Sequence, residues 1–177
     1  GLNAVWIDTS VVHEAEEAGF TVVDPESVAI THMTEVIREH LPDLLTFGAT
    51  QDLIKRLDRD YQKLVSEIPN PSPVILLQHV LQNLLAERLS IRNLPMIVEA
   101  VVEVAAVTKN VTLIGEHVRR RLAVQICHSL EDTEGYVPVI VLGPKWDAEF
   151  AANIRTQGDE TICTMSPAKV QEFILAA

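Results

Sequence analysis

The stretch LLAERLSIRNLPMIVEAV, residues 84–101, joins two apolar helical patterns through a break of only a few residues. Apolar side chains recur at spacings of three and four on both sides of the break, as on the buried face of a helix. Ser90–Asn93 lies between the two patterns, with Arg88 before it and Glu99 after it. This charged corner fits three interpretations: a connection between packed helices, a DNA-reading helix-turn-helix, or a partner-binding surface.

The helical pattern extends outward from the corner over residues 27–130 and predicts a helical bundle. The segment Ile68–Pro73 interrupts it, because three prolines cannot lie within one helix. We expect Ser27 to cap the first helix and Asn93 to cap the helix after the corner. Between them, the spacing predicts one helix from Ala49 or Thr50 to Val65.

The pattern changes after residue 135, where β-branched runs replace helical spacing. Val137–Leu142 and Thr161–Met165 read as strands, Trp146–Ile154 reads as a helix, and Ser166-Pro167 begins a last helix. The order predicts a βαβα unit with parallel strands. Two strands are too few for a stable sheet, so we expect this unit to be incomplete.

The N-terminal part carries two short β-prone runs, Val5–Ile7 and Phe20–Val23, around an acidic helix at Val11–Ala18. The fold class is therefore predicted to be α+β and mainly helical, with a helical bundle flanked by a short strand segment and the incomplete βαβα unit. We expect both ends to continue in a longer protein. The predicted divisions are residues 1–26, 27–130 and 131–177.

Composition limits the partners of this chain. Among 177 residues, 47% are hydrophobic, 22% are charged, and the net charge is −11, which indicates an acidic globular protein. Nucleic acids and anionic membrane surfaces are disfavoured as partners, because binding to them depends on cations that neutralise phosphate. An acidic surface favours basic partners, but it is more often simply solvated.

Two cysteines, Cys127 and Cys163, are too few for a disulfide framework or a four-cysteine zinc site. Each lies in an apolar run, so both are predicted to be buried and reduced. No apolar stretch approaches the roughly 20 residues that span a bilayer. The sequence also begins without the basic and apolar segments of a secretory signal peptide.

We find no catalytic, metal or cofactor site in the sequence. His13-Glu14 lacks the second histidine at the fourth following position that a helical zinc protease requires. Cys127 and His128 are adjacent, so on a helix they point about 100° apart and cannot pair as nucleophile and base. The glycines are too isolated for a phosphate loop. We therefore expect no enzyme activity, no metal and no cofactor.

The three consecutive arginines Arg119–Arg121 fan around a helix rather than forming one basic stripe. We expect them to form salt bridges with Glu116 or with a neighbouring acidic helix. The helix after the corner carries Glu99 and Glu103 but no lysine or arginine. Its acids would face phosphates or base edges without cations, which excludes the helix-turn-helix interpretation.

Four segments occur in an order that resembles the export-gate family of type III secretion, which includes flagellar FlhA and injectisome SctV. They are GLNAVWID (1–8), AGFTVVDPESVAITHMTEVIREH (18–40), LLQHVLQNLLAERLSIRNLPMIVEAV (76–101) and LIGEHVRRRLAVQI (113–126). The most specific part is VLQNLLAERLSIRNL (80–94). The sequence departs from many members at TFGATQDLIKRL (46–57), where Ala49-Thr50-Gln51 resembles flagellar members more closely.

The resemblance implies a protein of the bacterial inner membrane whose large cytoplasmic domain includes this region. The region would hold the end of an inserted subdomain, a return strand, the helical third subdomain and part of an α/β fourth. Members form a nonameric ring and receive export chaperone–substrate complexes, stalk proteins of the export ATPase and other export-gate membrane proteins. The resemblance implies no enzyme activity here.

The resemblance also suggests two sites. Chaperone–substrate complexes would dock at an apolar dimple, one wall of which corresponds to Ser27–Met33, with Val28 and Thr31 as the candidate contacts. The corner with Arg88, Arg92 and Glu99 would lie in the ring-forming subdomain. Its charges could form an intramolecular ion pair or a contact between ring subunits.

Two other functions remain open at the level of sequence. One is a helical adaptor or scaffolding domain without a role in secretion. The other is a small enzyme that binds a ligand at the end of the Val137–Leu142 strand, although Gly143-Pro144 lacks the glycine spacing of a phosphate site.

Overall fold

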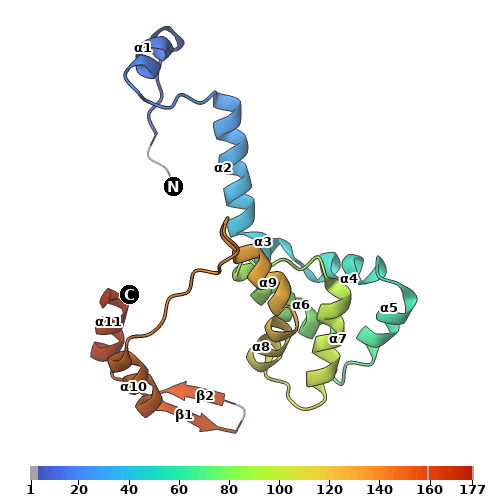
Figure 1. Cartoon of the computed structure of the whole chain (residues 1–177). Helices are drawn as coiled ribbons and strands as arrows, with labels where there is room; N and C mark the ends of the chain where they lie inside the picture. Colours follow the sequence, from blue (N-terminus) through green and yellow to red (C-terminus); the bar gives the residue numbers. More distant parts are fainter. Residues whose placement is uncertain (1–3, 159, 177) are drawn as a thin grey trace. The chain divides into compact units, whose positions relative to one another are not determined.

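The computed structural model describes residues 4–158 and 160–176, and the chain divides after Leu41 into two units (Figure 1). Helices dominate both units, and in the described ranges strands occur only as a short two-stranded sheet. This confirms the predicted α+β, mainly helical class. The two units are separated after Leu41, whereas the sequence predicted a boundary after residue 26. The predicted three-part division stays a prediction.

The first unit begins with a short capped helix. A 3-10 turn (Thr9–Val11) leads into α1 (Val12–Glu17), and Asp8 Oδ1 accepts a hydrogen bond from the backbone N–H of Ser10 at 2.9 Å. Gly19 follows with φ +86°, a conformation that favours glycine after a helix end. The predicted acidic helix is confirmed, and its caps are the ones its sequence offers.

Helix α2 (Pro25–Glu39) begins three residues earlier than expected because Asp24, not Ser27, is its cap. Asp24 Oδ1 accepts a hydrogen bond from the Ser27 N–H at 2.8 Å, and Pro25 occupies the first helical position. Proline suits that position because its missing N–H would have no partner there. No residue of α2 is buried.

The predicted strands at Val5–Ile7 and Phe20–Val23 are wrong, since neither segment has regular secondary structure. A strand needs a neighbouring backbone to satisfy its N–H and C=O groups, and no described residue supplies one. Trp6 and Phe20 are correspondingly 76% and 71% exposed. These residue types suit a half-buried sheet, and the described residues offer no sheet that would bury them.

The second unit contains a helical bundle, which corresponds to the later part of the predicted range 27–130. Helices α6 and α7 supply most of its buried side chains, α7 packs against α5 and α8, and α6 packs against α4 and α8. Leu77, Leu81, Leu84 and Ile97 are fully buried at the centre. The helices are α3 (Leu41–Leu44), α4 (Phe47–Lys55), α5 (Arg59–Ser66), α6 (Pro73–Ala86), α7 (Leu94–Ala105), α8 (Val111–Arg121) and α9 (Ala123–Leu130).

The single helix predicted from Ala49 or Thr50 to Val65 is divided into α4 and α5. Thr46 caps α4 and accepts a hydrogen bond from the Ala49 N–H at 3.2 Å. At the break, Gln62 Nε2 donates to the carbonyl oxygens of Lys55, at 3.2 Å, and Leu57, at 2.7 Å. These bonds supply partners for carbonyls that the interrupted helix leaves without one. The apolar spacing continues across the break, which is why it suggested one helix.

Two glutamines of α6 hold the turn that joins α3 to α4. Gln78 Nε2 donates to the carbonyl oxygen of Leu45 at 2.9 Å. Gln82 Nε2 donates to the same oxygen and to the carbonyl oxygen of Pro42, each at 3.1 Å. Because Leu45 is only 7% exposed, these side chains satisfy backbone acceptors that water reaches poorly.

The C-terminal region corrects the predicted βαβα unit. Its elements are α10 (Pro144–Asn153), β1 (Ile154–Gln157), β2 (Glu160–Cys163) and α11 (Pro167–Ala176). The two strands form an antiparallel hairpin in which Ile154 pairs with Cys163, so the predicted parallel pairing is wrong. The predicted helix and second strand are present, but the partner strand follows α10 directly. Gly158, with φ +63°, begins the reversal.

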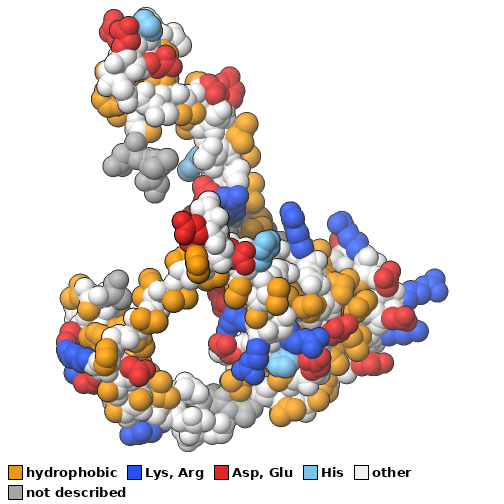
Figure 2. Space-filling model, viewed as in Figure 1, with side chains coloured by type: hydrophobic (Ala, Val, Ile, Leu, Met, Phe, Trp, Pro, Cys, Tyr) orange, Lys and Arg blue, Asp and Glu red, His pale blue; other side chains and the backbone are white. Residues whose placement is uncertain are grey.

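Val137–Leu142, predicted as a buried strand, pairs with no described residue, and all of it except the half-buried Val137 is exposed. Ile140 is fully exposed, and Figure 2 shows hydrophobic side chains along this connection. No described residue after Leu130 is buried. The region instead has a small aromatic contact, in which Phe173 meets Trp146 and Phe150 edge to face at 5.2 and 5.0 Å between ring centres.

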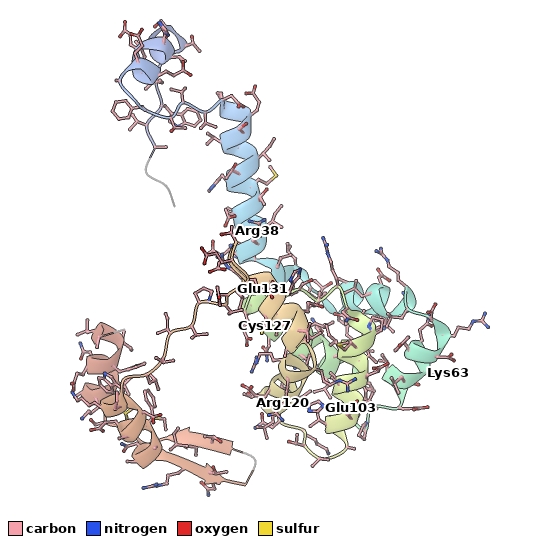
Figure 3. The ribbon with its side chains drawn as sticks, in the orientation of Figure 1. Arg38, Lys63, Glu103, Arg120, Cys127 and Glu131 are labelled. Atoms are coloured by element: carbon pink, nitrogen blue, oxygen red, sulfur yellow. The ribbon has the colours of Figure 1, made fainter. Side chains whose placement is uncertain are left out.

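Both cysteines are exposed, which corrects the prediction that they are buried. Cys127 lies on α9 (Figure 3), a helix with no buried residue, and Cys163 is the last residue of β2. In the described part of the chain, no helix combines the length and apolar character needed to cross a bilayer.

Candidate functional site

The charged corner between α6 and α7 is built on a left-handed residue. Arg88 has φ +59° and, among the described residues, is the only non-glycine with positive φ. Its N–H donates to the carbonyl of Leu85 at 2.9 Å, and the N–H of Leu89 donates to the carbonyl of Leu84 at 2.9 Å. This pair of bonds is the Schellman motif, whose left-handed residue is usually glycine.

An arginine at this position costs backbone energy that glycine would not. The left-handed conformation brings Cβ close to the following carbonyl oxygen, which costs an L-residue about 1 kcal/mol. Leu89 packs against the core just after the turn and helps to hold the conformation. The Arg88 side chain is exposed and has no salt bridge to a described residue. The packing thus fixes the turn and leaves the guanidinium outside.

The rest of the corner is held by α9. Gln125 Nε2 donates to the carbonyl oxygen of Ser90 at 3.0 Å, and Asn93 caps α7 by position without a side-chain hydrogen bond. The backbone N–H of Arg92 approaches Ser90 Oγ at 3.4 Å. The Arg92 side chain is exposed, again without a salt bridge to the described part of the chain. Both corner arginines therefore point their charge to solvent.

Glu99 does not pair with the corner arginines. Its Oε1 accepts a hydrogen bond from the Tyr61 hydroxyl at 3.1 Å, and its Oε2 accepts one from Arg121 Nη2 at 3.4 Å. An intramolecular ion pair of Glu99 thus exists, but with α8 instead of the corner. Arg121 also lies 3.4 Å from Glu103, whose other oxygen is 2.9 Å from His117 Nε2. This network joins α5, α7 and α8.

Two pKa shifts follow from the network. The hydrogen bond from His117, followed by the charge of Arg121, lowers the pKa of Glu103. The hydrogen bond and negative charge of Glu99 raise the pKa of Tyr61, because the ionised phenol would face a carboxylate. Glu103 lies on α7 and Arg120 on neighbouring α8 in Figure 3. Both shifts fit a structural network and call for no catalytic role.

Arg119 binds the remaining acidic side chain of the corner, Glu87. Its Nη1 donates to Glu87 at 2.6 Å, and its Nη2 donates to Glu116 at 2.5 Å. These bonds confirm the prediction that the arginine run forms salt bridges with Glu116 and with a neighbouring helix end. Because Glu87 is already paired, it does not neutralise Arg88 beside it.

The candidate docking residues lie on α2 in the first unit. Val28 and Thr31 are both exposed and are spaced three apart, which places them on one face of the helix. Ile30, Met33 and Ile37 are also exposed, at 67%, 63% and 45%. The helix thus presents apolar side chains that its own unit leaves uncovered.

A shallow apolar hollow of about 460 Å³ lies where the ligand-binding alternative expected a site, beside Leu142. Its lining includes Phe150, Ile154 and Phe173, with Asp147 as the single charged side chain. One exposed carboxylate offers no acid–base pair and no phosphate cradle. Within the described residues, no three His, Cys, Asp or Glu side chains are grouped as metal ligands.

Comparison with known proteins leads to the same family as the sequence resemblance. The FHIPEP family model matches residues 1–177. The chain belongs to the FHIPEP family. This confirms the predicted membership in the FlhA and SctV family of type III secretion export-gate proteins.

Among FHIPEP relatives, flagellar biosynthesis protein FlhA of Caulobacter vibrioides is 42% identical over 175 residues, which are 98% of this chain and 25% of that protein. FlhA of Bacillus subtilis is 35% identical over 168 residues, 94% of this chain and 25% of that protein. Low calcium response locus protein D of Yersinia pestis is 23% identical over 171 residues, 97% of this chain and 24% of that protein. The chain spans about a quarter of the length of these relatives.

Solved structures share the fold. CdsV of Chlamydia pneumoniae has a TM-score of 0.80 at 22% identity, over 99% of this chain and 52% of that one. Nonameric SctV-C of EPEC has a TM-score of 0.73 at 22% identity, over 95% of this chain and 52% of that one. Identities this low support the fold of the FHIPEP chain and nothing more specific.

Two features of the site were missed in the FHIPEP sequence. The left-handed turn at Arg88 lacks the glycine that normally marks a Schellman motif, so no local signal was present. The network through Tyr61 and Arg121 had a partial signal, since Glu99 and Glu103 are four residues apart and share a helix face. Their partners come from two other helices, and only the packing brings those together.

Proposed function

We propose that this chain is part of a flagellar type III export gate and serves protein export as a binding and assembly module, not as an enzyme. The observation that carries the proposal is the 42% identity to FlhA of Caulobacter vibrioides over 98% of the chain. The flagellar type is favoured because the Yersinia pestis low calcium response protein is only 23% identical over a similar length. In the longer protein this region lies on the cytoplasmic side of the bacterial inner membrane.

The proposed partners are export chaperone–substrate complexes, stalk proteins of the export ATPase and other export-gate membrane proteins. Subunits of the longer protein assemble into a nonameric ring, with Arg88, Arg92 and Glu99 as candidate contacts. Support comes from solved structures of similar fold, a complex of CdsV with CdsO and the nonameric SctV-C. No nucleic acid is among the partners, which agrees with the net charge of −11.

The decisive experiment is deletion of this region from its gene, followed by measurement of flagellar proteins in the culture supernatant. We expect secretion and motility to stop, and the intact gene supplied in trans to restore both. A helical adaptor without a secretion role predicts normal secretion after the deletion. That result would refute the proposal.

The docking residues can be tested separately. Val28→Asp and Thr31→Asp put a charge on the exposed face of α2, where desolvating a carboxylate should weaken binding of an apolar partner. We expect each to reduce secretion and chaperone binding while the protein remains folded and in the membrane. Val107→Asp is the matched control, because Val107 is 85% exposed in the loop between α7 and α8. Equal effects at all three positions would remove α2 from the site.

A further inference from the structure

One stripe of α2 begins with apolar contacts and ends with acids. Val28, Thr31, Glu35 and Glu39 follow one another at spacings of three, four and four residues, which places them on the same side of the helix. All four side chains are exposed, and α2 has no buried residue, so the first unit leaves this stripe open. A partner that lies along the stripe from Val28 also meets its acidic end.

The free charge of the stripe is on Glu39. Arg38 Nη1 donates to Glu35 Oε1 at 2.7 Å and balances its charge, and Figure 3 shows Arg38 toward the end of α2. Glu39 is exposed and has no salt bridge to a described residue. It is also the last residue of α2, at the negative end of the helix dipole, where a carboxylate destabilises the helix. The helix therefore keeps an unpaired acid at a position that its own stability disfavours.

The unit that carries α2 is much more acidic than the rest of the chain. Residues 1–41 contain eight acidic residues and one arginine, whereas residues 42–177 contain 17 acidic and 13 basic residues. Figure 2 shows acidic side chains over this first unit. An anionic lipid surface, or the first unit of a second copy, would bring like charge to α2 and be repelled. A basic protein surface is attracted instead.

We propose that α2 binds a protein segment that joins an apolar anchor to a lysine or arginine. The anchor packs on Val28 and Thr31, and the cation pairs with Glu39, which lies eight residues beyond Thr31, about 12 Å along the helix. This rests on the proposed docking of chaperone–substrate complexes at α2 and names the chemistry that they present there. The desolvated apolar contact supplies most of the affinity, and the ion pair selects the partner and fixes its direction along α2.

The experiment titrates the full-length protein in membrane vesicles with a flagellar chaperone–substrate complex of the same bacterium, at about 0.05 M and about 0.5 M salt. Glu39→Gln should weaken binding roughly threefold at low salt and very little at high salt, because salt screens an exposed ion pair. Glu39→Lys should weaken binding about tenfold at low salt, because it opposes like charges. Glu39→Gln should not lower the melting temperature, since it removes a carboxylate from the unfavourable end of the helix dipole.

Glu67→Gln is the matched control. Glu67 is also an exposed carboxylate at a helix end, since it directly follows α5, and it has no salt bridge to a described residue. Its replacement should leave both the affinity and the salt dependence of binding unchanged.

Two results would overturn the inference and keep the docking site. One is a Glu39→Gln protein that matches wild type in affinity and salt dependence while Val28→Asp weakens binding. The other is a Glu39→Lys protein that binds more tightly than wild type, which indicates an acidic partner. If the wild-type protein does not bind the complex at all, the proposed docking on α2 fails together with the inference.

Discussion

The two glutamines of α6 provide a quantitative test of how the bundle holds the turn between α3 and α4. Gln78 and Gln82 share one acceptor, the carbonyl oxygen of Leu45, at 2.9 and 3.1 Å. Replacing either glutamine with alanine leaves that oxygen with its other donor. Replacing both leaves a carbonyl in a residue only 7% exposed without either donor. The two substitutions should therefore not be additive.

The magnitude follows from the hydrogen bonds. A net contribution of about 1 kcal/mol per bond predicts about 0.5–1 kcal/mol for Gln78→Ala and about 1 kcal/mol for Gln82→Ala, which also loses Pro42. The double variant adds the cost of an unpaired buried acceptor and should lose about 3 kcal/mol. The interaction energy is then about 1 kcal/mol. A loss of about 3 kcal/mol lowers the melting temperature by roughly 15 °C in a domain of this size.

The assay is urea unfolding followed by circular dichroism for wild type, both single variants and the double variant. Asn83→Ala is the control, because Asn83 is an exposed neighbour on the same helix and should change stability by less than about 0.5 kcal/mol. Losses of the single variants that sum to the double loss within about 0.3 kcal/mol would refute the shared acceptor.

A charge at the same place adds a pH test. In Gln82→Glu an ionised carboxylate would face two carbonyl oxygens, whereas the protonated acid could still donate to one of them. Folding should therefore raise the pKa of the new carboxyl above its unfolded value. The penalty should be small below the unfolded pKa and should grow as the pH rises through the folded pKa. A penalty that is independent of pH would contradict the geometry.

Three further outcomes are expected. Hydrogen bonds from the side chain and backbone of Ser27 lower the pKa of Asp24 below its ordinary 3.8, so the cap should stabilise α2 above that pH and be lost as the pH falls through the folded value. Asp24→Asn should keep the cap without this titration, as followed by the Ser27 amide resonance. Arg119→Met should cost about 1–2 kcal/mol in urea unfolding, because Arg119 is 25% exposed and binds two carboxylates, whereas Arg120→Met should change stability by less than about 0.5 kcal/mol. Ile140→Lys should leave the unfolding free energy within about 0.5 kcal/mol of wild type and reduce light scattering at high concentration, since Ile140 is fully exposed in an apolar segment.

The sequence predicted helices where local chemistry and packing agree. Pro73 begins α6, and Asn110 caps α8 through its side chain, and both residue types favour these positions. Asp24 displaced Ser27 as the cap of α2 because a proline after it makes the earlier start favourable. Such competition between neighbouring caps shifts an end by a few residues without changing the helix.

Strands were harder to predict because they depend on residues that are distant in sequence. Val137–Leu142 has the composition of a buried strand, but a strand exists only when another backbone pairs with it. The hairpin partner of β2 was missed because Ile154–Gln157 alternates weakly and follows α10 without a turn signal. At the corner, the helices were predictable, but the partners of Glu99 were not, since α5 supplies its hydrogen bond from Tyr61 and α8 supplies its ion pair with Arg121.

The left-handed conformation of Arg88 also gives meaning to the mutations that its codon can acquire. Every arginine codon becomes a glycine codon by a change of its first base alone. Relief of the backbone strain is therefore within reach of the simplest mutation, in any lineage and whatever codon is used. If the guanidinium did nothing, that exchange would bring stability at no loss. A library of single-base changes at this codon, grown under selection for motility, thus compares the contribution of the arginine side chain to function with the stability that glycine would add to the turn.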